Sequence, residues 1–423
     1  MPFHYIPIAS RLHDSGSLSG YLARYKVALQ ETGGRPAEGT VTGSAFFLIL
    51  TGGTEQEVLR RYHSCQQQGQ PGSLLMIAHS AHNSLPAAME ILAQVRQEGG
   101  SGRIYLLRGP DDFTTLDQIR QTALCLEANR RLSEDRLGRV GESSDWLVAS
   151  SHLAEIVFAR FGLRIISIAM EDLRARIARE PVPETGPEYA IWERAAGVEG
   201  ITRETFTPTV RIYRALKELI TVHKLSGVTL RCFDLVLQDR TTGCLALSRL
   251  ADEGITAGCE GDIPSVVLLR WLWHLTRNSG WMANPADVNV LTGEVLLAHC
   301  TVPLSLTDDY HLQTHFESGL GIGIAGTLKP GPVTLLRLGG KQLDQWWGAE
   351  GQLAGYTHGG QHCRTQALIQ IPSAGARNLL EAPLGNHLVL IPGHVREMFA
   401  EAFQLNLAQR PIQKGFARPG PGG

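Results

Sequence analysis

Two carboxylates flanked by glycine lie in the segment Ala257–Asp262, at the start of a helical pattern. A buried carboxylate has to be hydrogen-bonded, paired with a cation or bound to a metal, because its removal from water is costly. Glutamate, histidine and amide oxygens together suit Mn²⁺, Mg²⁺ or a related divalent ion. The residues of these types that we single out as candidate metal ligands are Glu260, Asn284, His299 and His387. They are far apart in the sequence and no local motif links them, so their types alone leave the metal site as a hypothesis.

Two further polar segments follow apolar runs that read as strands. His79–Ser84 follows Leu74–Ala78, and a second polar segment with Asp145 and Trp146 follows the short strand near Val140. Parallel α/β sheets bind ligands at the carboxyl ends of their strands, so both segments are candidate binding loops. Asp145 can bind hydroxyl groups, and Trp146 can pack an apolar face against a sugar ring. Helix caps, surface histidines and a core tryptophan explain the same residues almost as well.

A glycine pattern near residue 320 imitates a dinucleotide-binding motif. Gly321, Gly323 and Gly326 match G-x-G-x-x-G, but that motif needs a helix directly after it. Here a Lys-Pro-Gly-Pro segment and a β-type run follow instead. We therefore discard NAD as a cofactor.

The elements that position these residues follow two patterns. In the first half, apolar runs alternate with helical periodicity, which is typical of βαβ units on a parallel sheet. The runs are Phe46–Leu50, Leu74–Ala78, Ile104–Leu107 and Ile165–Ile168. From about Met170 to Lys224 the pattern becomes helical after a proline-rich break at Pro181, Pro183 and Pro187, which indicates a passage between domains. A second α/β segment follows, with a strand over Val228–Cys232 and helices over Cys244–Ala251 and Ile263–His274.

Beyond Leu296, short β-type runs lie between turns rich in glycine and proline. The runs are Val333–Leu338, Ala367–Ile371 and His387–Ile391. They favour an antiparallel barrel, with a sandwich as the alternative. The predicted fold is therefore α/β, with Rossmann-like parallel-sheet domains followed by a C-terminal antiparallel β-barrel-like domain. The predicted division is an α/β domain over 1–170, a second over 171–295 that carries Glu260, a β-rich domain over 296–409, and a disordered tail over 410–423.

Composition narrows the class of protein. The chain has 423 residues, 43% of them hydrophobic and 19% charged, as in a globular protein with more than one domain. We expect no membrane span, no secretion signal and a cytoplasmic location. The seven cysteines form no CxxC pair, which argues against a disulfide framework or a thiolate zinc site. A net charge of −2 without a basic cluster disfavours nucleic acid, so the expected partner is a small molecule or another copy of the chain.

Taken together, several segments resemble the L-fucose isomerase-like family, whose better-known relatives isomerise L-fucose and, more remotely, L-arabinose. The resemblance runs from about Leu74 to Val395 and rests on the order and number of short matches. The matching stretches are His82–Ala88, Ser144–Leu147, Arg231–Asp234, Gly258–Asp262, Ala298–Pro303, His315–Gly319, Cys363–Gln366 and Gly385–His387.

The resemblance implies a homotrimer or homohexamer with active sites between subunits and a metal, usually Mn²⁺. It implies Glu260, His387 and, as in the arabinose isomerases, His299 as ligands, with Asn284 near the position of a ligating aspartate. The residues that it places at the substrate are His82, Asn83, Asp145, Trp146 and Asn386. Asn284 is the departure from the family, because an amide oxygen can bind a cation but cannot accept a proton as a base.

The implied reaction is aldose–ketose interconversion of a fucose- or arabinose-like or modified sugar through an enediol. Glu260 is the predicted base, and Asn284 stands at the second catalytic position of the family. If Asn284 replaces that second acid–base group, then Asp262, Asp287 or a histidine takes its role, or the reaction has changed. The alternatives are a metal-dependent lyase or epimerase acting on a sugar derivative, and a sugar-binding protein without turnover.

Overall fold

The computed structural model describes residues 2–10, 15–37, 45–67, 72–181, 186–357 and 361–410. The chain forms two compact units, one made of Met1–Arg130 and Met398–Gly423, the other of Arg131–Glu397. The predicted division into three domains and a tail stays a prediction. Pro183 and residues 411–423 of the predicted tail lie outside the described residues.

The first unit is built on a five-stranded parallel sheet with the order β2-β1-β3-β4-β5. Its central strands β3 (Phe46–Ile49) and β4 (Leu74–Ala78) are buried at every position, as expected for strands covered on both faces. They confirm two of the predicted runs. The other strands are β1 (Phe3–Ile8), β2 (Gly34–Pro36) and β5 (Gly102–Leu106). The helices are α1 (Ser15–Glu31), α2 (Glu55–Gln67), α3 (Ser84–Gln97), α4 (Phe113–Glu134) and α13 (Arg396–Gln409), the last two of which continue past the limit of the unit.

The second unit begins with a four-stranded parallel sheet of order β10-β9-β6-β7. Its strands are β6 (Arg136–Val140), β7 (Arg164–Ile168), β9 (Gly227–Leu230) and β10 (Thr256–Cys259). The helices are α5 (Ala154–Phe161), α6 (Met170–Arg179), α7 (Ala190–Arg194), α8 (Arg203–His223), α9 (Cys232–Asp239), α10 (Cys244–Asp252) and α11 (Ile263–Thr276). The predicted helices over Cys244–Ala251 and Ile263–His274 are thus confirmed as α10 and α11.

The stretch predicted to be helical contains one exception. Between η1 (Pro187–Tyr189) with α7 and the long α8, the chain forms the short strand β8 (Gly197–Glu199). This strand pairs in parallel with β13 (Thr307–Gln313), which also pairs with β14 (Gly323–Leu328). Three residues are too few for a periodic signal, so only the partner strand identifies β8. The G-x-G-x-x-G segment runs directly into β14 rather than into a helix.

A closed antiparallel barrel completes the second unit, with the strand order β11-β12-β17-β16-β15-β18. The barrel confirms the predicted fold class and excludes the sandwich. Its strands are β11 (Trp281–Asn289), β12 (Glu294–His299), β15 (Pro332–Gly339), β16 (Gln345–Tyr356), β17 (Thr365–Gln370) and β18 (Leu388–Pro392). The short η2 (Leu304–Leu306) leads into β13, and α12 (Ser373–Glu381) connects β17 to β18.

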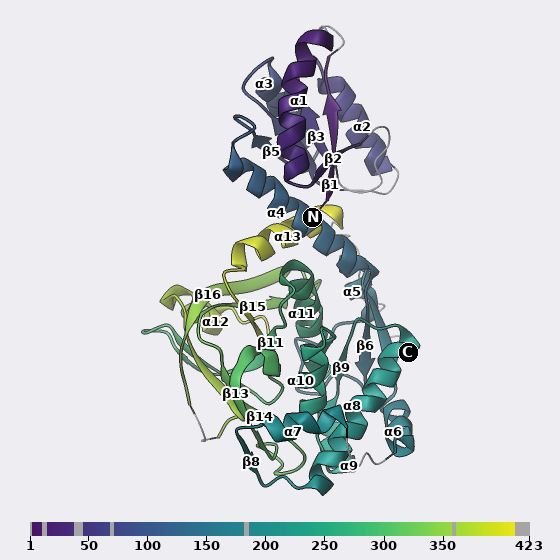
Figure 1. Cartoon of the computed structure of the whole chain (residues 1–423), viewed down its shortest axis with the longest axis vertical. Coiled ribbons are helices and arrows are strands. Elements are labelled where there is room, and N and C mark those ends of the chain that lie inside the picture. Colours follow the sequence, from purple (N-terminus) through teal and green to yellow (C-terminus); the bar gives the residue numbers. More distant parts are fainter. Residues whose placement is uncertain are drawn as a thin grey trace, which may run out of the picture. The chain divides into compact units, whose positions relative to one another are not determined.

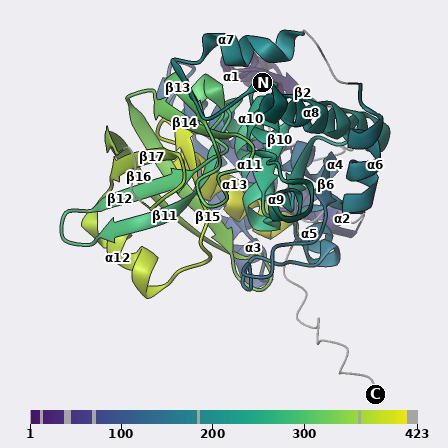
Figure 2. The same cartoon turned by 90° about the horizontal axis from the view of Figure 1, so that it is seen from below.

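Helix α11 joins the two parts of the second unit. It packs against β9 and β10 of the parallel sheet and against β11, β15 and β18 of the barrel (Figure 1). Figure 2 shows the barrel strands grouped on one side of this unit, away from α6 and α8. Buried side chains of the barrel strands, such as Trp281, Leu335 and Leu390, belong to one hydrophobic core cluster. In the part of the chain that the structure describes, we find no helix with the length and apolarity that a bilayer span requires.

Candidate metal centre

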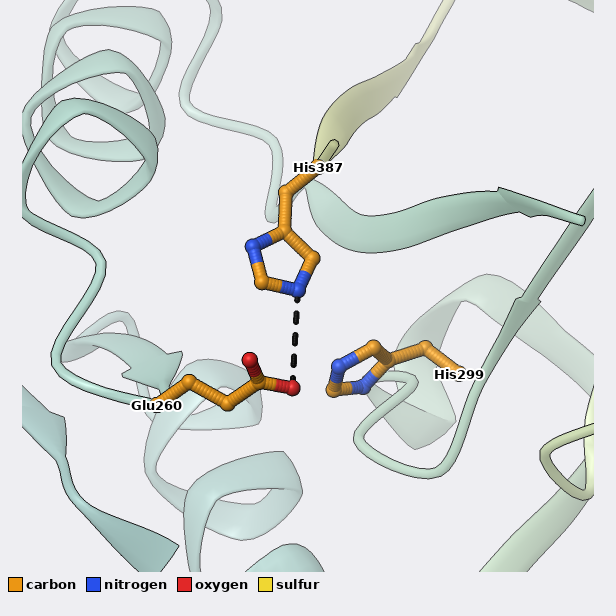
Figure 3. A group of neighbouring side chains, drawn as sticks. All are labelled: Glu260, His299 and His387. Carbon is orange, nitrogen blue, oxygen red and sulfur yellow. Dashed lines mark ion pairs between the residues drawn. The ribbon is translucent and has the colours of Figure 1, made fainter. Parts of the chain in front are cut away.

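Glu260, His299 and His387 meet at the junction between the parallel sheet and the barrel. Each offers one ligand atom, and these atoms lie within 4.8 Å of one another. All three side chains are buried. Figure 3 shows them pointing toward one another from three separate segments of the chain.

The backbone at Glu260 is held in an unusual conformation. Glu260 follows β10 directly and has a φ of 63°, in the left-handed region that side-chain-bearing residues rarely adopt. The loop after β6 holds it there, because Ser144 N donates to Glu260 O at 2.8 Å and Ser143 Oγ donates to Gly261 O at 2.8 Å. A Cβ at Gly261 would lie 2.7 Å from Glu142 O, so only glycine fits beneath this loop. Such strain is typical of functional sites.

The two histidines come from the barrel. His299 ends β12, and His387 immediately precedes β18, while β11 lies between these strands. Nδ1 of His299 lies 2.8 Å from Thr301 Oγ1. Because β11 pairs with both β12 and β18, the two imidazoles lie on either side of Ala283 and Asn284 of β11, next to the carboxyl end of β10.

Behind His387 lies a second buried carboxylate. Asp262 caps α11, with its Oδ1 accepting from Ser265 N at 2.8 Å, and its Oδ2 lies 2.8 Å from Nδ1 of His387. Burial opposes the charge on Asp262, but Arg337 and His387 outweigh it and hold the pKa of this carboxyl well below its usual range. A carboxylate on Nδ1 leaves Nε2 of His387 facing Glu260, as in many histidine ligands of metals.

The three side chains differ in charge. Burial disfavours the charged form of His387, yet Asp262 and Glu260 raise its pKa to about 9. Burial and the neighbouring His387 lower the pKa of His299 to about 4, so His299 is neutral at pH 7. Burial alone would raise the pKa of Glu260, but His387, His299 and Trp146 lower it, so Glu260 carries a negative charge.

These residues fit a divalent cation. Among the described residues, Nε2 of His387 is a buried atom without a hydrogen-bond partner, and it lies 3.6 Å from Glu260 Oε1. A cation next to this carboxylate would replace the proton on Nε2 and supply the missing partner. One carboxylate and two imidazoles are a ligand set that Mn²⁺, Zn²⁺ and related ions accept.

Asn284, the fourth predicted ligand, lies on β11, where Ala283 pairs with Leu388. Its Oδ1 accepts from Asn386 Nδ2 at 3.2 Å, which links it to the residue beside His387. Asp287 lies further along β11, past a bulge, and is exposed. Three strand residues span roughly 10 Å, so Asp287 and Asn284 lie at different points along β11. Which of the two takes the role of the family's aspartate stays a prediction. Asp262, the other carboxylate proposed as a substitute, contacts both His387 and Arg337 through its Oδ2 atom.

Trp146 and Asp145 lie on the loop after β6, as predicted. Nε1 of Trp146 donates to Glu260 Oε2 at 2.6 Å, and half of this side chain is exposed. Asp145 is exposed and accepts from Arg231 at 3.2 Å. The Trp146 ring contacts Phe233 edge-on with centroids 4.9 Å apart, and Phe233 contacts His315 at 5.9 Å.

Sequence reasoning did not assign a role to Phe233, His315, Thr301 or Arg337. The first three lie in or beside stretches that carry the family resemblance, which was a usable signal. Arg337 was detectable as a single charge within an apolar β-type run.

The two remaining predicted residues belong to the first unit. His82 and Asn83 lie between β4 and α3 and both have a left-handed backbone, with φ of 53° and 55°. Asn83 occupies the N-cap position of α3 without a side-chain capping bond, and Ser84 Oγ donates to Ile49 O. A substrate-binding role for His82 and Asn83 stays a prediction.

Comparison with known proteins gives one distant similarity and no family model that matches the chain. The chain is 22% identical over 241 residues to a sulfoquinovose isomerase from Alkalicoccus urumqiensis. The match covers 56% of this chain and 54% of the relative, so the chain spans about half the length of the protein that it matches. This similarity supports a relationship to the sugar isomerases in general and does not distinguish among them.

Proposed function

We propose that this protein is a divalent-metal-dependent aldose–ketose isomerase. The observation that carries the proposal is the buried Glu260, His299 and His387 group, in which Nε2 of His387 has no hydrogen-bond partner and faces Glu260 Oε1 at 3.6 Å. The distant sulfoquinovose isomerase supports the reaction class. Mn²⁺ is the first metal to test, and sulfoquinovose, L-fucose and L-arabinose are the first substrates.

A cation held by Glu260, His299 and His387 would polarise the carbonyl group of an open-chain sugar. Glu260 would take the proton from C2 of the aldose and return it to C1, with the hydroxyl proton moving from O2 to O1 through an enediol. Trp146 orients Glu260 through its indole N–H and offers an exposed ring face to the sugar. Asn284 and Asn386 are proposed to bind substrate hydroxyls or the cation with their amide groups.

The test is incubation of the protein with Mn²⁺ and each sugar in D₂O, followed by NMR. We expect isomerisation with deuterium at the carbon that receives the proton, and loss of activity on chelation. Elimination or inversion without carbonyl migration would instead support a lyase or epimerase. Saturable sugar binding without deuterium uptake would support a binding protein and contradict the proposal.

We also propose that the protein is active as a homotrimer or homohexamer, as the family resemblance implies. Sedimentation and activity should be measured at the same protein concentrations. Full activity in a monomer would contradict the proposed assembly and leave the proposal for the metal site unaffected.

A further inference from the structure

Arg337 is a buried charged side chain that no role assigned above explains. It lies on β15 within an apolar strand, and its side chain is 1% exposed. A guanidinium group without water must find partners for its donors, because an unpaired buried charge is very costly. The partners of Arg337 therefore show what it organises.

The guanidinium contacts three segments that build the metal centre. Nη1 donates to Asp262 Oδ2 at 3.2 Å and to Ser265 Oγ at 2.7 Å, both at the start of α11. Nη2 donates to Ser150 Oγ at 2.5 Å, in the loop that also carries Trp146. Nε faces Leu384 O at 3.5 Å, three residues before His387.

The chain leaves space for this guanidinium at Gly385. Gly385 has a φ of 144°, and a Cβ at this position would collide with the guanidinium of Arg337. The turn that leads to His387 is thus shaped around Arg337. Two independent features therefore relate Arg337 to the segment before His387: the hydrogen bond to Leu384 O and the close approach at Gly385.

We propose that Arg337 is a positioning residue of the metal centre, which holds Asp262 against Nδ1 of His387 and ties the Trp146 loop to the same point. It does so through Asp262, because the Oδ2 atom that accepts from Arg337 is also the atom nearest to His387 Nδ1. Partners behind a histidine ligand fix its orientation, and their loss lowers metal affinity by about 10- to 100-fold. The inference rests on the metal site of the proposed function.

The test is Co²⁺ binding to the full-length protein, followed through the d–d absorption spectrum, together with thermal unfolding. R337K and R337M should weaken Co²⁺ binding by about 10- to 100-fold and alter the spectrum, with R337K less affected because it keeps the charge. Since R337M leaves Asp262 charged and buried, the double variant R337M/D262N is included, which removes both charges. If Arg337 acts through Asp262, the losses in affinity of R337M and D262N are not additive in the double variant.

A matched control exists in the same unit. Arg270 pairs with the buried Asp135 at 2.7 Å, and Asp135 also contacts His274 at 2.6 Å, which reproduces the Arg–Asp–His arrangement at the start of β6. R270M should lower thermal stability and leave Co²⁺ affinity unchanged. If R337M and R337K bind Co²⁺ as wild type does, Arg337 has only a structural role. The inference then fails, and the proposed metal centre stands. If wild type binds no Co²⁺, the proposed metal centre fails and this inference falls with it.

Discussion

Replacing Glu260 with glutamine keeps the size and shape of the side chain and removes its charge. Nε1 of Trp146 donates to Glu260 Oε2, and Oε1 faces Nε2 of His387. In E260Q the amide oxygen keeps the bond to Trp146, so the amide NH₂ group turns toward His387 and the metal position. The variant therefore loses one ligand oxygen and the group that carries the proton.

The expected loss in turnover follows from the proton-transfer role. General acid–base catalysis contributes about 10²- to 10⁴-fold, which is about 2.7 to 5.4 kcal/mol of transition-state stabilisation. We expect kcat at saturating Mn²⁺ to fall by about 10²- to 10⁴-fold or more, while sugar binding persists in part. The drop in metal affinity has to be measured separately, by titration, so that kcat refers to the loaded protein.

The assay is isomerisation and deuterium uptake by NMR, with E171Q as the control. Glu171 lies on α6 with 80% of its side chain exposed, and its ion pair with Arg174 is 3.5 Å long. E171Q should match wild type. Near-normal turnover in metal-loaded E260Q would refute Glu260 as the base, and His299 and His315 would be the next candidates.

Three further predictions concern affinity, backbone strain and acid stability. N284D restores the carboxylate of the family pattern, so Mn²⁺ affinity measured by calorimetry should rise by about tenfold; unchanged affinity would remove Asn284 from the ligand set. G261A places a Cβ on a residue with a φ of 70° and against the loop at Glu142. The free energy of unfolding in urea should therefore fall by more than the roughly 1–2 kcal/mol that the left-handed backbone alone costs. G99A is the control, because Gly99 has a φ of 80° and open space around it. Burial lowers the pKa of His274 below 6.5, so the unfolded chain takes up a proton before the folded chain does, and stability is lost as pH falls below about 6.5. H274Q should therefore reduce the fall in the free energy of unfolding in urea between pH 7.5 and 5. An unchanged dependence on pH would contradict this role of His274.

Local patterns in the sequence determined the elements and part of the site. The run Leu74–Ala78 was readable because burial on both faces of a strand gives a continuous apolar run. The helix over Ile263–His274 was readable because a buried helix carries apolar residues at helical spacing. β1 and β8 were missed, since β1 contains Pro7 and β8 has only three residues. Glu260 was identifiable because two carboxylates flanked by glycine stand at the start of a helical pattern, and a buried carboxylate needs a partner.

Only the tertiary structure decided which of the candidate residues meet. His299 and His387 reach Glu260 through the closure of the barrel and the register of β11 with β12 and β18, which no short-range pattern encodes. Asp287 is exposed on β11, and Asp262 at the start of α11 contacts Nδ1 of His387, and neither position could be read from the sequence. Side-chain type is a local property, whereas the convergence of ligands depends on contacts between distant segments. Arg337 is an example, because its single guanidinium group contacts both the start of α11 and the loop that carries Trp146.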